Sequence, residues 1–170
     1  MILEQLGVAF TVVVSDAEEL LAGDPIEVAV ENARRKAQAV EAEASVLGVD
    51  TVVVLDGAIY GKPADAADAR ATLERLSGRV HEVVSGVAVV EAGETRTASA
   101  TTRVSFRPLD AATLDWYLAT GEWRERAGGY AIQGRGAALV AGIEGDYLNV
   151  VGLPVAALLE LLPGILHASR

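Results

Sequence analysis

Residues 47–55 read LGVDTVVVL, a nearly continuous apolar run that predicts a β-strand buried on both faces. Asp50 interrupts this run, and a carboxylate in such a strand is costly unless it meets a cation, a metal ion or a hydrogen-bond donor. Two interpretations stay open. Asp50 is bonded to nearby backbone amides at the strand end, or it is a metal ligand or general base.

The sequence on either side of this strand predicts helices and hairpins. Asp24-Pro25 marks the start of a helix over 25–44, and Asp65 caps a second helix that ends near Ser77-Gly78. The other predicted elements are strands over 8–14, 58–60, 80–91, 94–106, 137–143 and 147–151, and helices over 110–120 and 154–162. This mixture of hairpins and helices favours an α/β or α+β domain with a mixed sheet.

Composition excludes several classes of protein. The chain has 170 residues, of which 51% are hydrophobic and 22% charged, so it is a folded domain and not a disordered segment. A net charge of −10 argues against a nucleic-acid binder, and the absence of cysteine excludes disulfides and thiolate catalysis. The most apolar stretch, Val150 to Leu162, is too short to span a bilayer. With no signal peptide visible at the start, we expect a cytoplasmic protein without membrane partners.

The basic residues are almost all arginine, because only Lys36 and Lys62 among the 14 are lysine. An ammonium group suits phosphate oxygens, so a lysine kept in such a sequence is a candidate phosphate ligand, with chance as the alternative. Lys36 lies one turn after Asn32 on the same face of the predicted helix, and Lys62 lies in the turn Gly61-Lys62-Pro63.

Three further features are candidates for binding or structure. Glu18-Glu19 offers a second carboxylate for a hard divalent cation, unless it is an ordinary solvated loop. The run from Gly128 to Gly136 is dense in glycine, and Gln133 within it offers a donor and an acceptor to a base edge. His81 has no second histidine nearby in the sequence, and we expect it to be structural.

Taken together, the motifs resemble the Maf family of nucleotide pyrophosphatases. The matching segments occur in family order and cover nearly the whole chain: 48–54, 61–63, 76–83, 127–134 and 149–154. The resemblance implies a single domain over 1–170 with a fold like inosine-triphosphate pyrophosphatase, an elongated mixed sheet with two lobes around a cleft. It also implies hydrolysis of a nucleoside triphosphate between the α and β phosphates.

The resemblance assigns roles to the charged candidates. Asp50 matches the family's proton acceptor, Lys36 and Lys62 match its phosphate-contacting lysines, and Glu19 matches an acidic position near the metal. A triphosphate needs a divalent cation to approach so acidic a protein, so Mg²⁺ is expected, with Mn²⁺ or Co²⁺ as alternatives. Which of Asp50 and Glu19 is the metal ligand and which the base stays open.

The resemblance also assigns the base-binding residues. Thr51 and Gln133 fall where the family selects its base, and the Tyr-x-Ile-Gln-Gly form at 130–134 resembles the branch that acts on dTTP and UTP. The family is usually homodimeric. The alternative to an enzyme is a non-catalytic nucleotide-binding or septum-formation regulatory protein.

The start of the sequence departs from the family pattern. Family members open with a strand and a Ser-x-Ser-Pro-Arg-Arg phosphate loop, whereas Met1 to Gly7 already resembles the last turns of the helix that follows them. The start codon is assigned too far downstream, or the chain is short by nature. For a chain without that loop, we expect weak or no turnover and a partly unpaired sheet.

Overall fold

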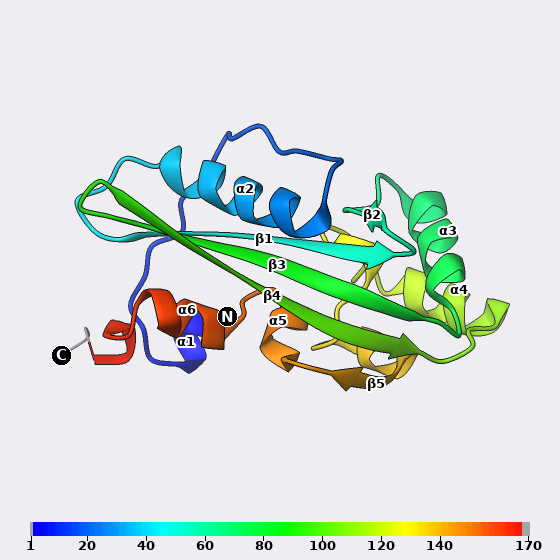
Figure 1. The fold of residues 1–170 in the computed structure, drawn as a ribbon. Coiled ribbons are helices and arrows are strands. Elements are labelled where there is room, and N and C mark those ends of the chain that lie inside the picture. The colour runs from blue at the N-terminus through cyan, green and yellow to red at the C-terminus, as the bar shows by residue number, and fades with distance from the viewer. Residues whose placement is uncertain (1, 168–170) are drawn as a thin grey trace.

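The computed structural model describes residues 2–167 and shows a five-stranded sheet in the order β2-β1-β3-β4-β5 (Figure 1). The strands are β1 (Val46–Leu55), β2 (Ala58–Tyr60), β3 (Val80–Glu91), β4 (Glu94–Phe106) and β5 (Val140–Glu144). The predicted single α/β domain is confirmed. The predicted mixed sheet is wrong for the described residues, because every neighbouring pair of strands is antiparallel.

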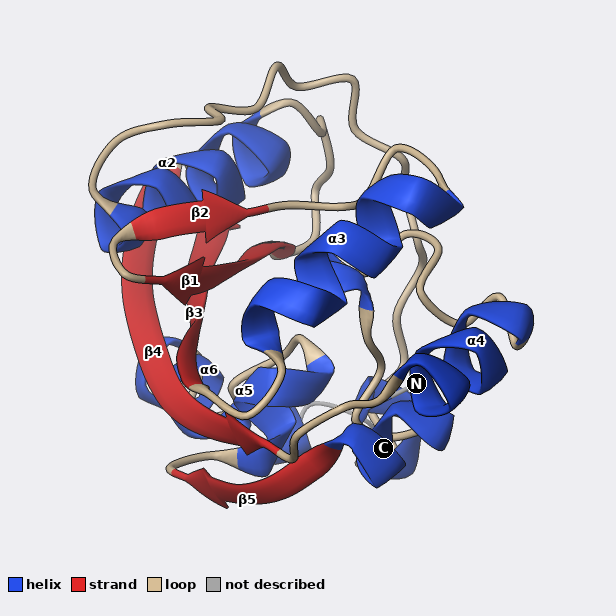
Figure 2. Ribbon diagram, turned by 90° about the vertical axis from the view of Figure 1, so that its right-hand side faces the viewer, coloured by secondary structure: helices blue, strands red, loops and turns tan. Residues whose placement is uncertain are grey.

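Helices cover both faces of the sheet and one end of it. The long helix α2 (Pro25–Gln38) lies on one face, and α1 (Ile2–Gln5), α5 (Tyr147–Val151) and α6 (Val155–Leu161) lie on the other (Figure 1). Helices α3 (Ala66–Leu76) and α4 (Ala111–Ala119) lie at the end where β1 and β4 finish (Figure 2). Three 3₁₀ turns, at Ala127–Gly129, Arg135–Leu139 and Ile165–His167, complete the fold. None of the described helices is long and apolar enough to cross a membrane.

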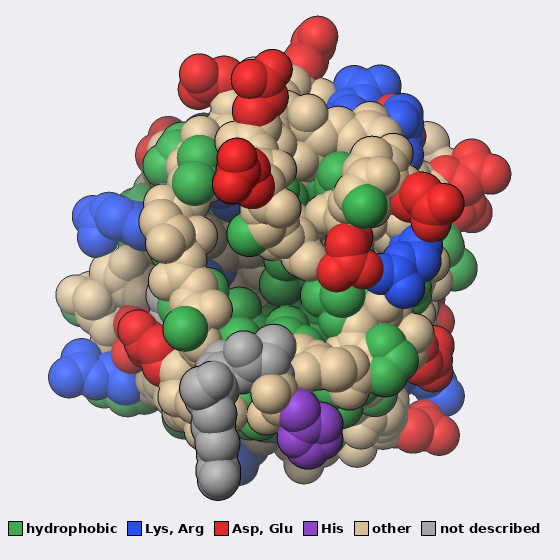
Figure 3. Space-filling view, turned by 90° about the vertical axis from the view of Figure 1, so that its left-hand side faces the viewer, with side chains coloured by type: hydrophobic (Ala, Val, Ile, Leu, Met, Phe, Trp, Pro, Cys, Tyr) green, Lys and Arg blue, Asp and Glu red, His purple; other side chains and the backbone are tan. Residues whose placement is uncertain are grey.

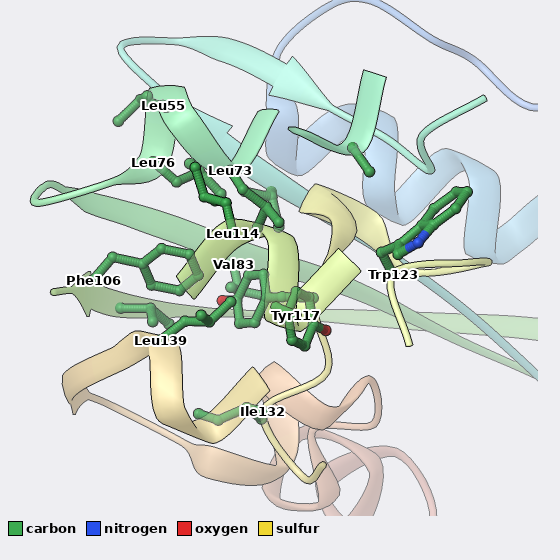
Figure 4. Packing of buried hydrophobic residues seen from close by; sticks show 14 residues of the cluster. Leu55, Leu73, Leu76, Val83, Phe106, Leu114, Tyr117, Trp123, Ile132 and Leu139 are labelled. Atoms are coloured by element: carbon green, nitrogen blue, oxygen red, sulfur yellow. The ribbon is translucent and has the colours of Figure 1, made fainter. Parts of the chain in front are cut away.

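The largest apolar cluster lies at the α3–α4 end, where Val53 and Phe106 of the sheet meet Leu73, Leu114 and Tyr117 (Figure 4). A second cluster forms where α6 packs on the opposite face from α2, around Leu158. The two clusters occupy different parts of the sheet, so the middle of β1, which carries Asp50, lies between them.

Helix α2 packs unusually close to the sheet. Its stripe of Ala29, Ala33 and Ala37 is fully buried. A Cβ on Gly48 would lie 2.2 Å from the carbonyl oxygen of Ala33, and one on Gly86 would lie 2.2 Å from that of Ala29. Only glycine allows this approach. The helix residues that follow Ala29 and Ala33 therefore lie directly above the middle of β1.

The strand predicted over 8–14 is wrong, because residues 8–22 have no regular structure. A β-branched run forms a strand only where another strand edge pairs with it, and Val12, Val13 and Val14 are each more than half exposed. On the side of β1 away from β3, β2 pairs only with residues 53–55, so within residues 2–167 no strand lies against 46–52 on that side.

A groove of about 1280 Å³ runs beside this open edge, between residues 8–13, 46–49 and 161–165. Figure 3 shows the hollowed face, with hydrophobic side chains in its floor.

Three other predictions also differ. The strand predicted over 137–143 begins only at Val140, because residues 135–139 form a 3₁₀ turn. Residues 147–151 form helix α5 and not a strand, because Asp146 caps the amide of Leu148 and Gly152 ends the turn with a φ of 119°. Helix α2 ends at Gln38 and not at residue 44, since residues 41–45 are exposed and have no sheet to pack on. The helix expected at the start is present as α1, and Met1 lies outside the described residues.

His81 is structural, as predicted. Its side chain is 1% exposed, its Nε2 lies 2.8 Å from the Tyr130 hydroxyl, and its ring meets Phe106 edge-on. Among the described residues its Nδ1 has no hydrogen-bond partner. Burial therefore lowers the pKa of His81 to about 4 from its ordinary 6.5.

We expect this histidine to make the fold acid-sensitive. Between pH 6.5 and 4 the unfolded chain binds a proton that folded His81 cannot accept, so stability falls as the pH falls through this window. Each unit of pKa separation contributes about 1.4 kcal/mol. Urea unfolding of wild type and His81→Gln at several pH values measures the effect. We expect the free energy of unfolding to depend less steeply on pH in the variant. His167→Gln, at an exposed histidine, is the control. Equal slopes for His81→Gln and wild type would contradict the assignment.

Candidate active site

A cleft of about 300 Å³ lies at the open edge of β1 and collects most of the residues singled out in the sequence. Its lining includes Lys36, Asp50, Thr51, Lys62 and Gln133. Successive side chains on a strand point to opposite faces, so Asp50 faces α2 while Thr51 faces α5. The cleft reaches both residues because it wraps around the strand edge that has no neighbour at this point.

The charged end of the cleft is built around one ammonium group. Lys36 Nζ lies 2.6 Å from Asp50 Oδ1 and 2.7 Å from Glu19 Oε1, so one lysine bridges the two predicted carboxylates. Burial by itself lowers the pKa of Lys36, but the hydrogen bonds to Asp50 and Glu19 outweigh it, and the pKa is raised above its ordinary value. Lys36 is therefore a fixed positive charge next to Asp50.

The second oxygen of Asp50 is held by a residue that sequence reasoning did not propose for the site. Asn32 Nδ2 donates to Asp50 Oδ2 at 3.0 Å. Of the two interpretations of Asp50, capping by backbone amides is not what the structure shows, since a lysine and an asparagine side chain bind its two oxygens. The signal for Asn32 was its position one turn before Lys36 on the same helix face.

Lys62 lies at the other side of the cleft, in the turn after β2. Its Nζ is 3.3 Å from Glu125 Oε2, and both side chains are more than half exposed. An exposed ion pair of this kind contributes little stability, so Lys62 is free to exchange Glu125 for an anionic ligand. Nothing in the sequence distinguished Glu125 from other loop acids.

The glycine-rich loop supplies the uncharged end. Gly128 and Gly129 adopt φ values of 67° and 71°, and the amide of Gly128 donates to the carbonyl of Gly61, which ties this loop to the Lys62 turn. Gln133 follows with an exposed side chain at the cleft. Across from it, Thr51 Oγ1 lies 2.8 Å from Ser85 Oγ on β3.

Two side chains outside the cleft hold this loop in shape, and the sequence pattern revealed neither. Glu122 Oε2 accepts from the amides of Arg135 and Gly136 at 2.8 and 3.3 Å. The Tyr117 hydroxyl accepts from the amide of Ala131 at 3.0 Å. The backbone around Gln133 is therefore fixed from both sides.

The donor set is compatible with a hard divalent cation carried by a phosphate ligand. Residues 2–167 contain no group of three or more His, Asp and Glu side chains able to hold a metal ion by themselves. Mg²⁺, however, commonly uses one or two protein carboxylates and fills its other positions with water and substrate phosphate. Glu19 and Asp50, both within 2.7 Å of one nitrogen, are a pair of that kind.

Comparison with known proteins gives one consistent result. The family model described as "Maf-like protein" matches residues 1–165. The chain is 48% identical over 166 residues to a dTTP/UTP pyrophosphatase of Symbiobacterium thermophilum, an alignment that covers 95% of this chain and 86% of the relative. It is 46% identical over 169 residues to one of Dictyoglomus thermophilum (95% and 88%), and 44% identical over 142 residues to one of Pyrococcus furiosus (82% and 75%). With this match over almost its whole length, the chain belongs to the Maf-like protein family.

Proposed function

We propose that the protein hydrolyses dTTP and UTP to the nucleoside monophosphate and pyrophosphate. The observation that carries the proposal is the cleft at the β1 edge, whose lining combines the charged side chains of Lys36, Lys62 and Asp50 with the uncharged ones of Thr51 and Gln133. Such a combination suits a ligand that carries both an anionic chain and a polar base. Relatives at 44–48% identity are named for this activity.

In the proposed mechanism, Asp50 accepts a proton from a water molecule that attacks the α-phosphorus. The bond from the α-phosphorus to the bridging oxygen breaks, and pyrophosphate leaves with the electron pair. Lys36 and Lys62 neutralise charge on the phosphates, and Asn32 keeps the Asp50 carboxylate oriented. Glu19 and Asp50 would hold a divalent cation, which when bound would supply Lewis-acid stabilisation to the phosphate oxygens. We expect this cation to be magnesium, with manganese or cobalt as the alternatives.

The direct test is pyrophosphate release from a panel of dTTP, UTP, CTP and 7-methyl-GTP, with Mg²⁺ and with EDTA. We expect release from dTTP and UTP that depends on the cation. Absence of release from every triphosphate, both by this chain and by a version extended with the family's N-terminal phosphate loop, contradicts the enzyme proposal. Calorimetric binding of UTP without turnover then supports the non-catalytic nucleotide-binding alternative.

Gln133 is expected to read the pyrimidine edge. Gln133→Met keeps the length of the side chain and removes its donor and acceptor, so the kcat/KM for UTP falls and the UTP-to-CTP ratio of kcat/KM falls by about tenfold or more. Steady-state kinetics with both nucleotides measures this. Gln38→Met, at an exposed glutamine on α2, is the matched control. A Gln133→Met enzyme with the wild-type ratio excludes this role.

We further propose a homodimer that acts in the cytoplasm, on the family resemblance and on the presence of the nucleotide pool there. Sedimentation equilibrium of the purified protein measures its oligomeric state. Cell fractionation measures its location.

A further inference from the structure

We propose that Asn32 is a positioning residue that holds the Glu19 segment and the Asp50 strand in one arrangement, so that the two carboxylates share a cation. This inference rests on the proposed function, because it concerns the same cleft. It assigns a role to a residue that does not line the cleft.

The geometry uses all the hydrogen-bonding capacity of the Asn32 amide apart from one oxygen lone pair. Oδ1 accepts from the amide of Leu20 at 2.7 Å, and Nδ2 donates to the carbonyl of Leu20 and to Asp50 Oδ2, each at 3.0 Å. The residue is 2% exposed. Reversing the amide would place its oxygen against both the Leu20 carbonyl and the Asp50 carboxylate, so only this orientation is satisfied.

The Leu20 contact matters because Leu20 directly follows Glu19 in the chain. Residues 8–22 have no regular structure to position a side chain. The two-point bond to Leu20 therefore fixes the backbone next to Glu19, while the third bond fixes Asp50. Helix α2 also contacts the backbone of this segment where Arg35 Nη1 donates to the carbonyl of Glu18, but that bond is exposed.

Lys36 and Asn32 hold the same two segments in different ways. The lysine bridges Glu19 and Asp50 through its single ammonium group, and that bridge must open if a divalent cation takes its place between the carboxylates. The Asn32 bonds do not involve the oxygens that bind Lys36, because they use Asp50 Oδ2 and the backbone of Leu20. The asparagine is thus able to keep the two carboxylates together while the cation between them changes.

The test compares Asn32→Ala, which removes all three bonds, with Asn32→Asp, which keeps the shape and the acceptor for Leu20 but loses both donations. For Asn32→Ala we expect kcat to fall, and the Mg²⁺ concentration for half-maximal activity to rise by about 10- to 100-fold. The KM for UTP at saturating Mg²⁺ stays near its wild-type value. Gln38→Ala, on the same helix and exposed, is the control for changes to α2.

Two readouts do not need turnover. In the nucleotide-free protein, NMR-detected hydrogen exchange at the Leu20 amide should be about tenfold faster or more in Asn32→Ala than in wild type. It should stay closer to wild type in Asn32→Asp. Mn²⁺ titration followed by water-proton relaxation should show weaker binding in Asn32→Ala. These measurements decide the role of Asn32 even if the wild type releases no pyrophosphate, which would contradict only the proposed function.

The inference is overturned if Asn32→Ala keeps wild-type Leu20 exchange, or if its Mg²⁺ and Mn²⁺ dependence equals that of Gln38→Ala. If the alanine variant does not fold, as judged by circular dichroism, the isosteric Asn32→Asp carries the test. Weaker Mn²⁺ binding with a native melting transition then supports the inference, because the added negative charge alone would strengthen binding. Mn²⁺ binding equal to or tighter than that of wild type overturns it.

Discussion

Asp50→Asn is expected to lower kcat for UTP hydrolysis by about 10²- to 10⁴-fold, the range typical for removal of a general base. The amide has the same shape as the carboxylate and still offers an oxygen to Asn32 Nδ2, so the strand and helix α2 remain in place. What is lost is the proton acceptor and the negative charge next to Lys36. Steady-state kinetics measures the loss of turnover, and thermal unfolding checks that the fold is intact.

The matched control for this variant is Asp56→Asn, in the turn that directly follows the same strand. Asp56 is exposed, pairs with Arg79, and has a φ of 52°, a conformation that asparagine also adopts readily. We expect its kcat to equal that of wild type. Retention of wild-type kcat in Asp50→Asn removes Asp50 from the role of base. Equal losses in both variants point to a general effect of charge.

The sequence contained enough to predict strand β1 and its chemistry, because both depend on local pattern. Burying a single carboxylate in an apolar run costs free energy. Lys36 and Asn32 offset that cost by donating hydrogen bonds to its two oxygens. The alternation of side chains along a strand explains why adjacent Asp50 and Thr51 reach different ends of the cleft.

What the sequence did not reveal depends on contacts between distant segments. The run at 8–14 has the composition of a strand, but pairing needs a neighbouring edge that composition does not report. Glu122 and Glu125 look like other loop acids, and only the folded chain brings them to the glycine-rich loop and to Lys62. Residues 147–151 are as apolar as a strand, and the cap at Asp146 together with the turn at Gly152 makes them a helix.

Gly86→Ala is expected to destabilise the protein by at least about 3 kcal/mol, because the new methyl group has no space. Its Cβ would lie 2.2 Å from the carbonyl oxygen of Ala29 and 2.3 Å from the carbonyl carbon, and backbone cannot move aside as a flexible side chain can. Gly86 is also the cross-strand partner of Asp50. A helix α2 pushed outward here would separate Asn32 and Lys36 from Asp50. Urea unfolding measures the stability, and pyrophosphate release from UTP by the folded fraction measures the site.

Gly142→Ala separates this close approach from the general effect of replacing a strand glycine. A Cβ at Gly142 meets no atom within 4 Å, so we expect a change within about 0.5 kcal/mol, or a slight gain from the less flexible unfolded chain. If Gly86→Ala is as stable and as active as Gly142→Ala, the close packing of α2 on the sheet does not determine the geometry at Asp50. If Gly86→Ala loses both stability and turnover, turnover depends on the close packing between the alanine stripe of α2 and the two glycines beneath it. They set the distance between the helix that carries Asn32 and Lys36 and the strand that carries Asp50.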